Sequence, residues 1–191
     1  MNLINVDFNE LKKLNSETVG WIQVNGTNIN YPFVQANDNK YYLNHSFDKS
    51  SNEAGWVFLD YRNDYIGIDK NSILYAHGRN DNTMFGSLIN ILTNGWLNNK
   101  NNFILKVSTE KENSLWQVFS AYVIPTTSDY LKINFNNNEQ FLEFSNMLIE
   151  RSEYNFNTTV NKFDKILTLS TCYNNTHKTV LHAKLIKKSS N

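Results

Sequence analysis

The chain has 191 residues, with 18 basic and 18 acidic side chains and a single cysteine. This length predicts one domain, large enough to bury about 70% of the surface of its unfolded chain without disulfides or metals as staples. A formal net charge of zero argues against a nucleic-acid-binding protein, because such proteins usually carry a clustered basic excess. One cysteine excludes an internal disulfide framework and a cysteine-rich zinc site, and no apolar run approaches the ~20 residues of a membrane-spanning helix.

The N-terminal part of the chain predicts a short helix followed by a hairpin. Asp7 can cap a helix whose apolar residues recur on one face. Two strand-like runs, 21–24 and 28–31, flank the pair Asn25-Gly26. This pair is a strong hairpin signal because both of its residues tolerate positive φ.

The rest of the chain alternates apolar runs with polar turns. A short helix is predicted at 84–92, and a connection of about 40 residues, 126–165, contains one helix with an apolar stripe at 141–149. Connections this long are usually functional. Strands are predicted at 56–59, 72–76, 103–107, 115–124, 166–171 and 179–186. Because strands dominate, an antiparallel barrel or sandwich with peripheral helices fits better than alternating βαβ units.

Cys172 is the first candidate for chemistry, because it stands where an apolar strand ends and a polar loop begins. Most lone cysteines are simply small buried apolar residues. Reactive groups held by a rigid scaffold are common at such strand ends, however, and this position favours a nucleophile.

A cysteine nucleophile needs a base or cation that generates its thiolate, and histidine is the usual choice. His77 is favoured because it also ends an apolar strand, and His177, in the loop after the cysteine, comes second. His182 lies within a strand and is expected to be a hydrogen-bonded structural residue. His45 is expected at the surface, because its neighbours are polar.

A third group should stabilise the negative charge that develops on a reacting carbonyl, a role that suits arginine. No arginine follows Cys172, and Lys178 is the nearest cation in sequence. Its alternative role is a solvated charge at the start of a strand. No phosphate-binding glycine loop or metalloprotease motif is present. Several acidic residues lack the spacing of a metal-binding loop and are expected on a solvated surface: Glu53, Asp60, Asp64 and Asp69.

Two segments resemble the catalytic motifs of sortases. Residues 168–172, Thr-Leu-Ser-Thr-Cys, are similar to the strand-end nucleophile motif of that family. Residues 75–78, Tyr-Ala-His-Gly, are similar to its histidine segment, and the likeness runs from about Asp7 to Lys187. Class B fits best, because that class has an N-terminal helical element and a helix inserted before the nucleophile strand.

The resemblance implies a mainly β fold, an eight-stranded sortase-type β-barrel. Residues 1–20 would form an N-terminal helical segment packed on the barrel, and residues 21–191 would form the catalytic barrel of a single domain. The resemblance also implies an enzyme tethered to the extracellular face of the cytoplasmic membrane of a Gram-positive bacterium. We therefore expect that a natural N-terminal anchor precedes this sequence and has been trimmed away.

The reaction implied by the resemblance is transpeptidation. Cys172 attacks the carbonyl of a threonine in the C-terminal sorting signal of a surface protein, and a thioester forms. An amine of a cell-wall precursor or of peptidoglycan then resolves the thioester, with His77 as general acid and base. The expected partners are thus a sorting-signal peptide and a cell-wall amine, without nucleic acid, and the chemistry needs no metal or other cofactor.

The resemblance also assigns residues to the substrate groove. Tyr75 and Ser170 match positions that line the groove in class B. Thr171, beside the nucleophile, and Tyr154, in the long connection, are assigned to the same groove.

One position departs from the family pattern. The family carries an arginine on the strand after the cysteine, and Lys178 stands at the matching position here. Lysine can supply a charge and one hydrogen bond but not a bidentate fork, and Arg79 is an alternative partner. Two other functions therefore stay open beside the transpeptidase: a hydrolytic cysteine peptidase on the same scaffold, or a catalytically degenerate surface-binding domain.

Overall fold

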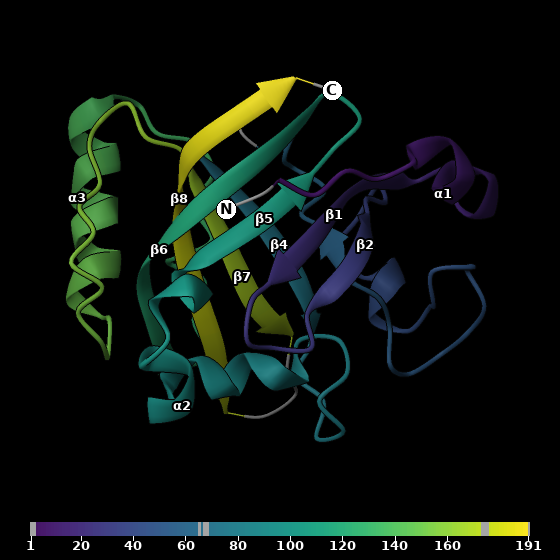
Figure 1. The fold of residues 1–191 in the computed structure, drawn as a ribbon, viewed down its shortest axis with the longest axis horizontal. Coiled ribbons are helices and arrows are strands. Elements are labelled where there is room, and N and C mark those ends of the chain that lie inside the picture. Colours follow the sequence, from purple (N-terminus) through teal and green to yellow (C-terminus); the bar gives the residue numbers. More distant parts are fainter. Residues whose placement is uncertain (1–2, 65, 67–68, 173–175, 191) are drawn as a thin grey trace.

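The chain folds into a closed barrel of eight strands. The computed structural model describes residues 3–64, 66, 69–172 and 176–190, and of Cys172 it describes the backbone. The strands are β1 (Thr18–Val24), β2 (Asn30–Val34), β3 (Phe58–Leu59), β4 (Asn71–His77), β5 (Ile104–Ser108), β6 (Glu112–Pro125), β7 (Ile166–Cys172) and β8 (His177–Ser190). Around the barrel they follow the order β1-β2-β3-β4-β7-β8-β6-β5 (Figure 1). The expected mainly β, eight-stranded barrel is confirmed.

Short helices lie around the barrel. They are α1 (Phe8–Leu14), η1 (Tyr41–Leu43), η2 (Gly86–Leu92), α2 (Asn94–Leu97), η3 (Lys100–Phe103) and α3 (Asn138–Glu150). Asp7 caps α1 as predicted, because its carboxylate accepts the amide hydrogen of Asn9 at 3.0 Å. The helix predicted at 84–92 is a 3₁₀ helix, η2. In Figure 1, α3 stands beside β6 and β8, at the side of the barrel.

Two boundaries differ from the sequence-based expectation. Strand β1 begins at Thr18, so the barrel starts inside the segment 1–20 that was expected to be helical. The hairpin after it is wider than a two-residue turn: Val24 donates its amide hydrogen to the carbonyl of Ile29 at 2.9 Å. Of the Asn25-Gly26 pair, only Gly26 adopts positive φ, at 71°.

The expectation of antiparallel pairing is wrong at two places. β4 and β7 pair in parallel over seven residues, and β2 and β3 pair in parallel at Val34 and Phe58. Parallel neighbours need a long crossover, and the segments between β4 and β7 supply one. The consequence is that β4 and β7 end at the same edge, with His77 paired to the backbone of Cys172.

Successive side chains along β4 and β7 point alternately into the barrel and out of it, so the buried side chains form an inner and an outer layer. Leu74 and Ala76 of β4, and Leu167 and Leu169 of β7, belong to the core inside the barrel. The intervening residue Tyr75 belongs to a second cluster outside it, which also includes Ile73 and Ile133. The outer face of β4 and β7 is therefore covered by part of the long connection, and this cover positions the site.

Candidate active site

His77 stands at the end of β4, half-buried, in the outward-facing phase of the strand. Its Nε2 lies 2.6 Å from the carbonyl oxygen of Leu43. Because a carbonyl only accepts, Nε2 carries the hydrogen in this arrangement. The Leu43 carbonyl thus fixes the ring orientation, as an orienting partner does for a catalytic imidazole.

Cys172 ends β7 directly beside His77. The parallel register pairs the two backbones, and four of the six preceding pairs are formed by fully buried residues of β4 and β7. The side chain of Cys172 lies outside the described residues, as do residues 173–175 of the short loop that follows. The backbone alone brings together the two strand ends that the sequence motifs singled out.

Lys178 approaches the same edge from β8. The antiparallel ladder between β7 and β8 extends to the pair Ser170–Val180, and Lys178 lies two residues before Val180 on β8. The Nζ of half-buried Lys178 donates to the carbonyl oxygen of Thr171 at 3.4 Å, a long hydrogen bond. A cation is therefore held one peptide unit from the candidate nucleophile, by one hydrogen bond to the described part of the chain.

Arg79, the alternative cation, forms an ion pair with Asp81. Its guanidinium donates to both carboxylate oxygens of Asp81, at 2.9–3.3 Å, and to the hydroxyl of Thr83 at 3.1 Å. The hydrogen bonds from Arg79 hold the pKa of the Asp81 carboxyl well below its usual range. Since Asp81 occupies the fork of Arg79, Lys178 is the better placed of the two cations.

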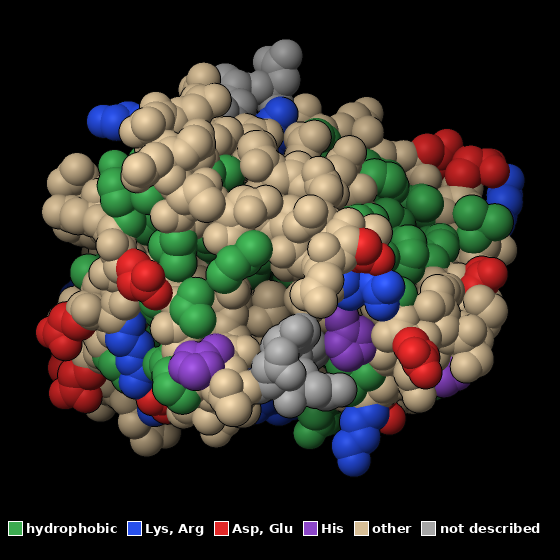
Figure 2. All heavy atoms as spheres, turned by 90° about the horizontal axis from the view of Figure 1, so that it is seen from below, with side chains coloured by type: hydrophobic (Ala, Val, Ile, Leu, Met, Phe, Trp, Pro, Cys, Tyr) green, Lys and Arg blue, Asp and Glu red, His purple; other side chains and the backbone are tan. Residues whose placement is uncertain are grey.

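Two cavities flank the segment Gly78–Asn80 that follows His77. One, of about 810 Å³, is lined by His77, Leu43, Asn44 and Glu53. The other, of about 380 Å³, is lined by Lys178, Thr171, Phe85, Ile89 and Val123. Figure 2 looks at this lower end of the barrel and shows histidine side chains with acidic and basic side chains near them. The two cavities meet at the strand ends, so two different ligands have room to approach the same edge.

Two residues predicted to line the substrate groove are buried instead. Ser170 has no exposed surface, and its Oγ lies 2.9 Å from the hydroxyl of Tyr130. Tyr75 is 6% exposed and donates its hydroxyl hydrogen to buried Asp60 at 2.9 Å. Both lie two residues before the paired strand ends, so in this structure they support the site from behind.

The other two predicted groove residues lie in different surroundings. The hydroxyl of Thr171 accepts the amide hydrogen of Thr179 at 3.0 Å, although Thr171 does line the smaller cavity. Tyr154 packs against Phe103 and Phe156 in a separate pocket that also includes Lys184. Lys184 is six residues along β8 from Lys178, about 20 Å at ~3.3 Å per residue. Tyr154 therefore lies apart from the two cavities at the strand ends, and its assignment to the wall of the substrate groove stays a prediction.

The remaining histidines lie largely as predicted. His182 is fully buried and hydrogen-bonded on both ring nitrogens, to Tyr122 at 2.8 Å and to Thr168 at 2.9 Å. Burial, together with the charge of Arg151, lowers the pKa of His182 to about 3. His45 is half-buried and stacks on Tyr41.

Asp60 lies in surroundings that differ from those expected from the sequence. It was expected on a solvated surface, yet it is fully buried and paired with Arg62. Burial opposes its ionisation, but hydrogen bonds from Arg62 and Tyr75 outweigh burial and hold its pKa below the usual value. The available signal was an Asp-x-Arg pattern directly after an apolar strand, a spacing that lets the two side chains meet in a turn.

Comparison with known proteins agrees with this geometry. The sortase domain model matches residues 22–186. Sortase B of Staphylococcus aureus is 36% identical over 186 residues, which cover 95% of this chain and 75% of that protein. This chain belongs to the sortase family, in its class B. The class B relatives are cysteine transpeptidases, so the chain is an enzyme of this kind.

Solved class B structures extend the match to three dimensions. A Staphylococcus aureus sortase B–substrate complex superposes with a TM-score of 0.88 at 35% identity, covering 94% of this chain and 84% of that one. A sortase B complexed with triglycine gives the same TM-score and identity, and the match covers 85% of that chain. Anchoring of proteins to the cell wall is the known function of sortases.

Within the described ranges, no group of three or more His, Cys, Asp or Glu side chains is arranged to hold a metal ion. Within the same ranges, no helix is long and apolar enough to cross a membrane.

Proposed function

We propose that this class B sortase cleaves a sorting signal after its threonine and joins the carbonyl to a cell-wall amine. The observation that carries the proposal is the parallel pairing of β4 with β7, because it brings the strand ends at His77 and Cys172 together. The solved sortase B–substrate complex supports a peptide as the first partner. The threonine, the thioester and the amine are inferred from the chemistry of this class.

The reaction has two halves that use the same groups. In the first, the thiolate of Cys172 attacks the threonine carbonyl carbon, and Lys178 stabilises the oxyanion that develops. The carbon–nitrogen bond then breaks, and protonated His77 gives its proton to the leaving amine. In the second half, the incoming amine attacks the thioester carbonyl, His77 accepts a proton from that amine, and the carbon–sulfur bond breaks to restore the thiolate.

The cavity beside His77 suits the incoming amine. It is lined by Glu53, Asn44 and Asp81, and the negative charge of Asp81 is paired with Arg79. The carboxylate of exposed Glu53 can attract an ammonium group, and His77 in the same cavity can then deprotonate it. The solved complex of a sortase B with triglycine supports a short peptide amine as the acceptor.

We also place the enzyme on the extracellular face of the cytoplasmic membrane of a Gram-positive bacterium, held by an anchor that precedes this sequence. Surface proteins and cell-wall amines meet on that side of the membrane. Membrane fractionation of a tagged full-length protein tests this location, and recovery in the cytosol would contradict it.

Cleavage of a panel of fluorogenic Asn-Pro-x-Thr peptides, with and without triglycine, tests the function. We expect cysteine-dependent cleavage and a ligated product, and loss of several orders of magnitude in rate for Cys172→Ala. Full activity of Cys172→Ala would refute the mechanism. Silence of the wild-type protein across the panel would favour a catalytically degenerate domain.

A hydrolytic peptidase is the second candidate, and lysine at position 178, where the family carries arginine, favours it. One contact controls the acyl-enzyme less strictly than a bidentate fork, so water could compete with the amine. The ratio of hydrolysed to ligated product at saturating triglycine decides between the two. A ligated product in high yield excludes the peptidase.

A further inference from the structure

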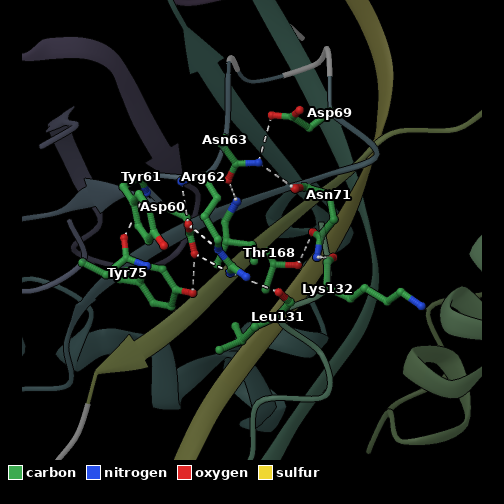
Figure 3. Close-up of polar contacts among 12 residues, drawn as sticks. Asp60, Tyr61, Arg62, Asn63, Asp69, Asn71, Tyr75, Leu131, Lys132 and Thr168 are labelled. Carbon is green, nitrogen blue, oxygen red and sulfur yellow. Dashed lines mark hydrogen bonds and ion pairs between the residues drawn. The ribbon is translucent and has the colours of Figure 1, made fainter. Parts of the chain in front are cut away.

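The segment Tyr130–Ile133 of the long connection is held by side chains from elsewhere in the fold. Three successive carbonyl groups of this segment accept hydrogen bonds from two residues. Asn71 Nδ2 donates to the carbonyls of Tyr130 at 3.4 Å and of Lys132 at 2.9 Å, and Arg62 Nη2 donates to the carbonyl of Leu131 at 3.2 Å (Figure 3). The segment adopts neither helix nor strand, so these contacts take the place of a backbone ladder.

Arg62 is itself fixed by a buried carboxylate. Its Nε and Nη2 donate to the two oxygens of Asp60 at 2.9 and 2.7 Å. Tyr75 adds a third hydrogen bond to the same carboxylate, at 2.9 Å. A bidentate ion pair of this kind is rigid and directional, so the second hydrogen of Arg62 Nη2 points at the Leu131 carbonyl.

Asn71 is fixed by a chain of hydrogen bonds with one direction. Its Oδ1 accepts the hydroxyl hydrogen of Thr168 at 2.7 Å, which leaves its NH₂ group facing the carbonyls. Thr168 then accepts from Nδ1 of His182 at 2.9 Å, and Nε2 of His182 accepts from the Tyr122 hydroxyl at 2.8 Å. In this series of hydrogen bonds each hydrogen has one acceptor, which fixes the amide orientation of Asn71.

The held segment covers the strands that lead to the site. The hydroxyl of Tyr130 contacts Ser170 at 2.9 Å, and Ile133 packs in the outer cluster with Tyr75. Tyr75 and Ser170 are paired across β4 and β7, two residues before His77 and Cys172. The segment therefore lies over the outer face of the two strands, two residues from the paired strand ends.

We propose that Arg62 and Asn71 are positioning residues for the sorting-signal peptide. They hold Tyr130–Ile133 as a wall of the peptide site without touching the peptide themselves. This inference rests on the proposed function, since it assumes that a peptide substrate occupies the outer face. It assigns a role to two polar residues that the chemical steps do not use: the buried Asn71, and the exposed Arg62 with its buried partner Asp60.

The test uses Arg62→Lys and Asn71→Ala in an otherwise intact chain. Lysine keeps the charge against Asp60 but cannot reproduce the two-nitrogen contact with the carboxylate that aims Arg62 at the Leu131 carbonyl. Lys132→Ala is the matched control, because its side chain lies in the same segment and extends away from the network in Figure 3. Two measurements are made: hydrogen exchange of the segment's amides, and the dissociation constant of a fluorescent Asn-Pro-Gln-Thr peptide in the Cys172→Ala background.

We expect faster exchange at 130–133 but not in β4 or β7, and an increase of about tenfold in the dissociation constant. In the active chain, the same variants should raise KM for the peptide and leave the KM for triglycine and kcat within threefold. The control should match the parent in all of these. A merely structural role would lower the active fraction without changing KM.

Unchanged exchange in both variants would overturn the inference, and so would faster exchange with an unchanged dissociation constant. Failure of the proposed function is recognised separately, by cleavage in the unmutated chain that does not depend on Cys172. Absence of peptide binding by the Cys172→Ala protein would remove both the proposed function and this role.

Discussion

The outer face of the barrel has two polar regions that are held very differently. Behind the site, Asp60, Asn71, Thr168 and His182 are all fully buried and joined to one another or to neighbours by hydrogen bonds of 2.7–2.9 Å. At the rim, the half-buried Lys178 makes one hydrogen bond to the described residues, a long one of 3.4 Å to the carbonyl oxygen of Thr171. The first region has the properties of a scaffold, and the second has those of a reaction site.

The difference reflects what each region must do. A buried polar network stabilises one arrangement, because every unpaired donor or acceptor would be costly there. Groups that bind an oxyanion or transfer protons must instead change partners during each turnover. We therefore expect substitutions at the rim to affect turnover without much loss of stability, and substitutions in the network to do the reverse.

The largest effect short of removing the nucleophile is expected at His77. His77→Gln should lower kcat for ligation by about 10²–10⁴-fold, the usual contribution of a general acid and base, with little change in melting temperature. Steady-state ligation kinetics and a thermal melt measure both. His45→Gln serves as the control, because His45 is also half-buried but lies outside the strand ends. A loss below tenfold would transfer the role to His177.

Lys178 should rank next. Lys178→Ala should reduce turnover by about 10²–10³-fold, the usual range for the loss of one oxyanion donor. Lys178→Arg should retain turnover and lower the share of hydrolysed product, because its fork can make two hydrogen bonds. Product ratios and kcat are the readouts, with Lys184→Ala as a control on the same strand. A change below threefold for Lys178→Ala would shift the role to Arg79.

The positions of the two strand ends could be predicted from the sequence, because the residues of each strand carry the signal themselves. The run 72–76 is mostly apolar, and the run 166–171 combines Ile and Leu with small Thr and Ser residues, a composition typical of strands. Both runs are buried on both faces of the sheet. Each is followed by a residue able to do chemistry, His77 or Cys172. The two motifs therefore indicated the reaction before the geometry was known.

The network behind the site could not be predicted in the same way. The parallel pairing of β4 and β7 joins segments almost a hundred residues apart, and no local pattern encodes it. The burial of Asp60 depends on Tyr75, which reaches it only in the folded barrel. Tyr154 was assigned from its place in a long connection, but that connection reaches the strand ends through Tyr130 instead.

The pH dependence of stability tests the buried network through His182. Its pKa falls from an ordinary value of 6.5 to about 3 because of burial, so below pH 6.5 the unfolded chain binds a proton that the folded chain does not. The free energy of unfolding should therefore fall as the pH drops below 6.5, by up to about 1.4 kcal/mol per unit. Above pH 6.5 this contribution is fully present and constant.

Urea unfolding between pH 4.5 and 8, for the parent and His182→Gln, measures this dependence. Glutamine does not titrate, so the variant should be less stable at pH 7 but lose less stability on acidification. The range above pH 7 provides the internal control, because neither protein should show this slope there. Equal slopes in the two proteins below pH 6 would show that His182 takes up a proton in the folded state.

The smallest effect is expected at Ser170, and it separates the two regions most directly. If Ser170 lined the groove, Ser170→Ala would raise KM for the peptide and leave stability unchanged. Because its Oγ is buried against Tyr130, we expect the opposite: a loss of about 1–3 kcal/mol in stability, with KM and kcat within threefold of the parent. Thr171→Val, which removes the hydroxyl that accepts from Thr179, is the neighbouring comparison. If Ser170→Ala instead keeps the stability of the parent and binds the peptide more weakly, Ser170 lines the groove. The outer layer of β4 and β7 would then belong to the reaction site and not to the scaffold.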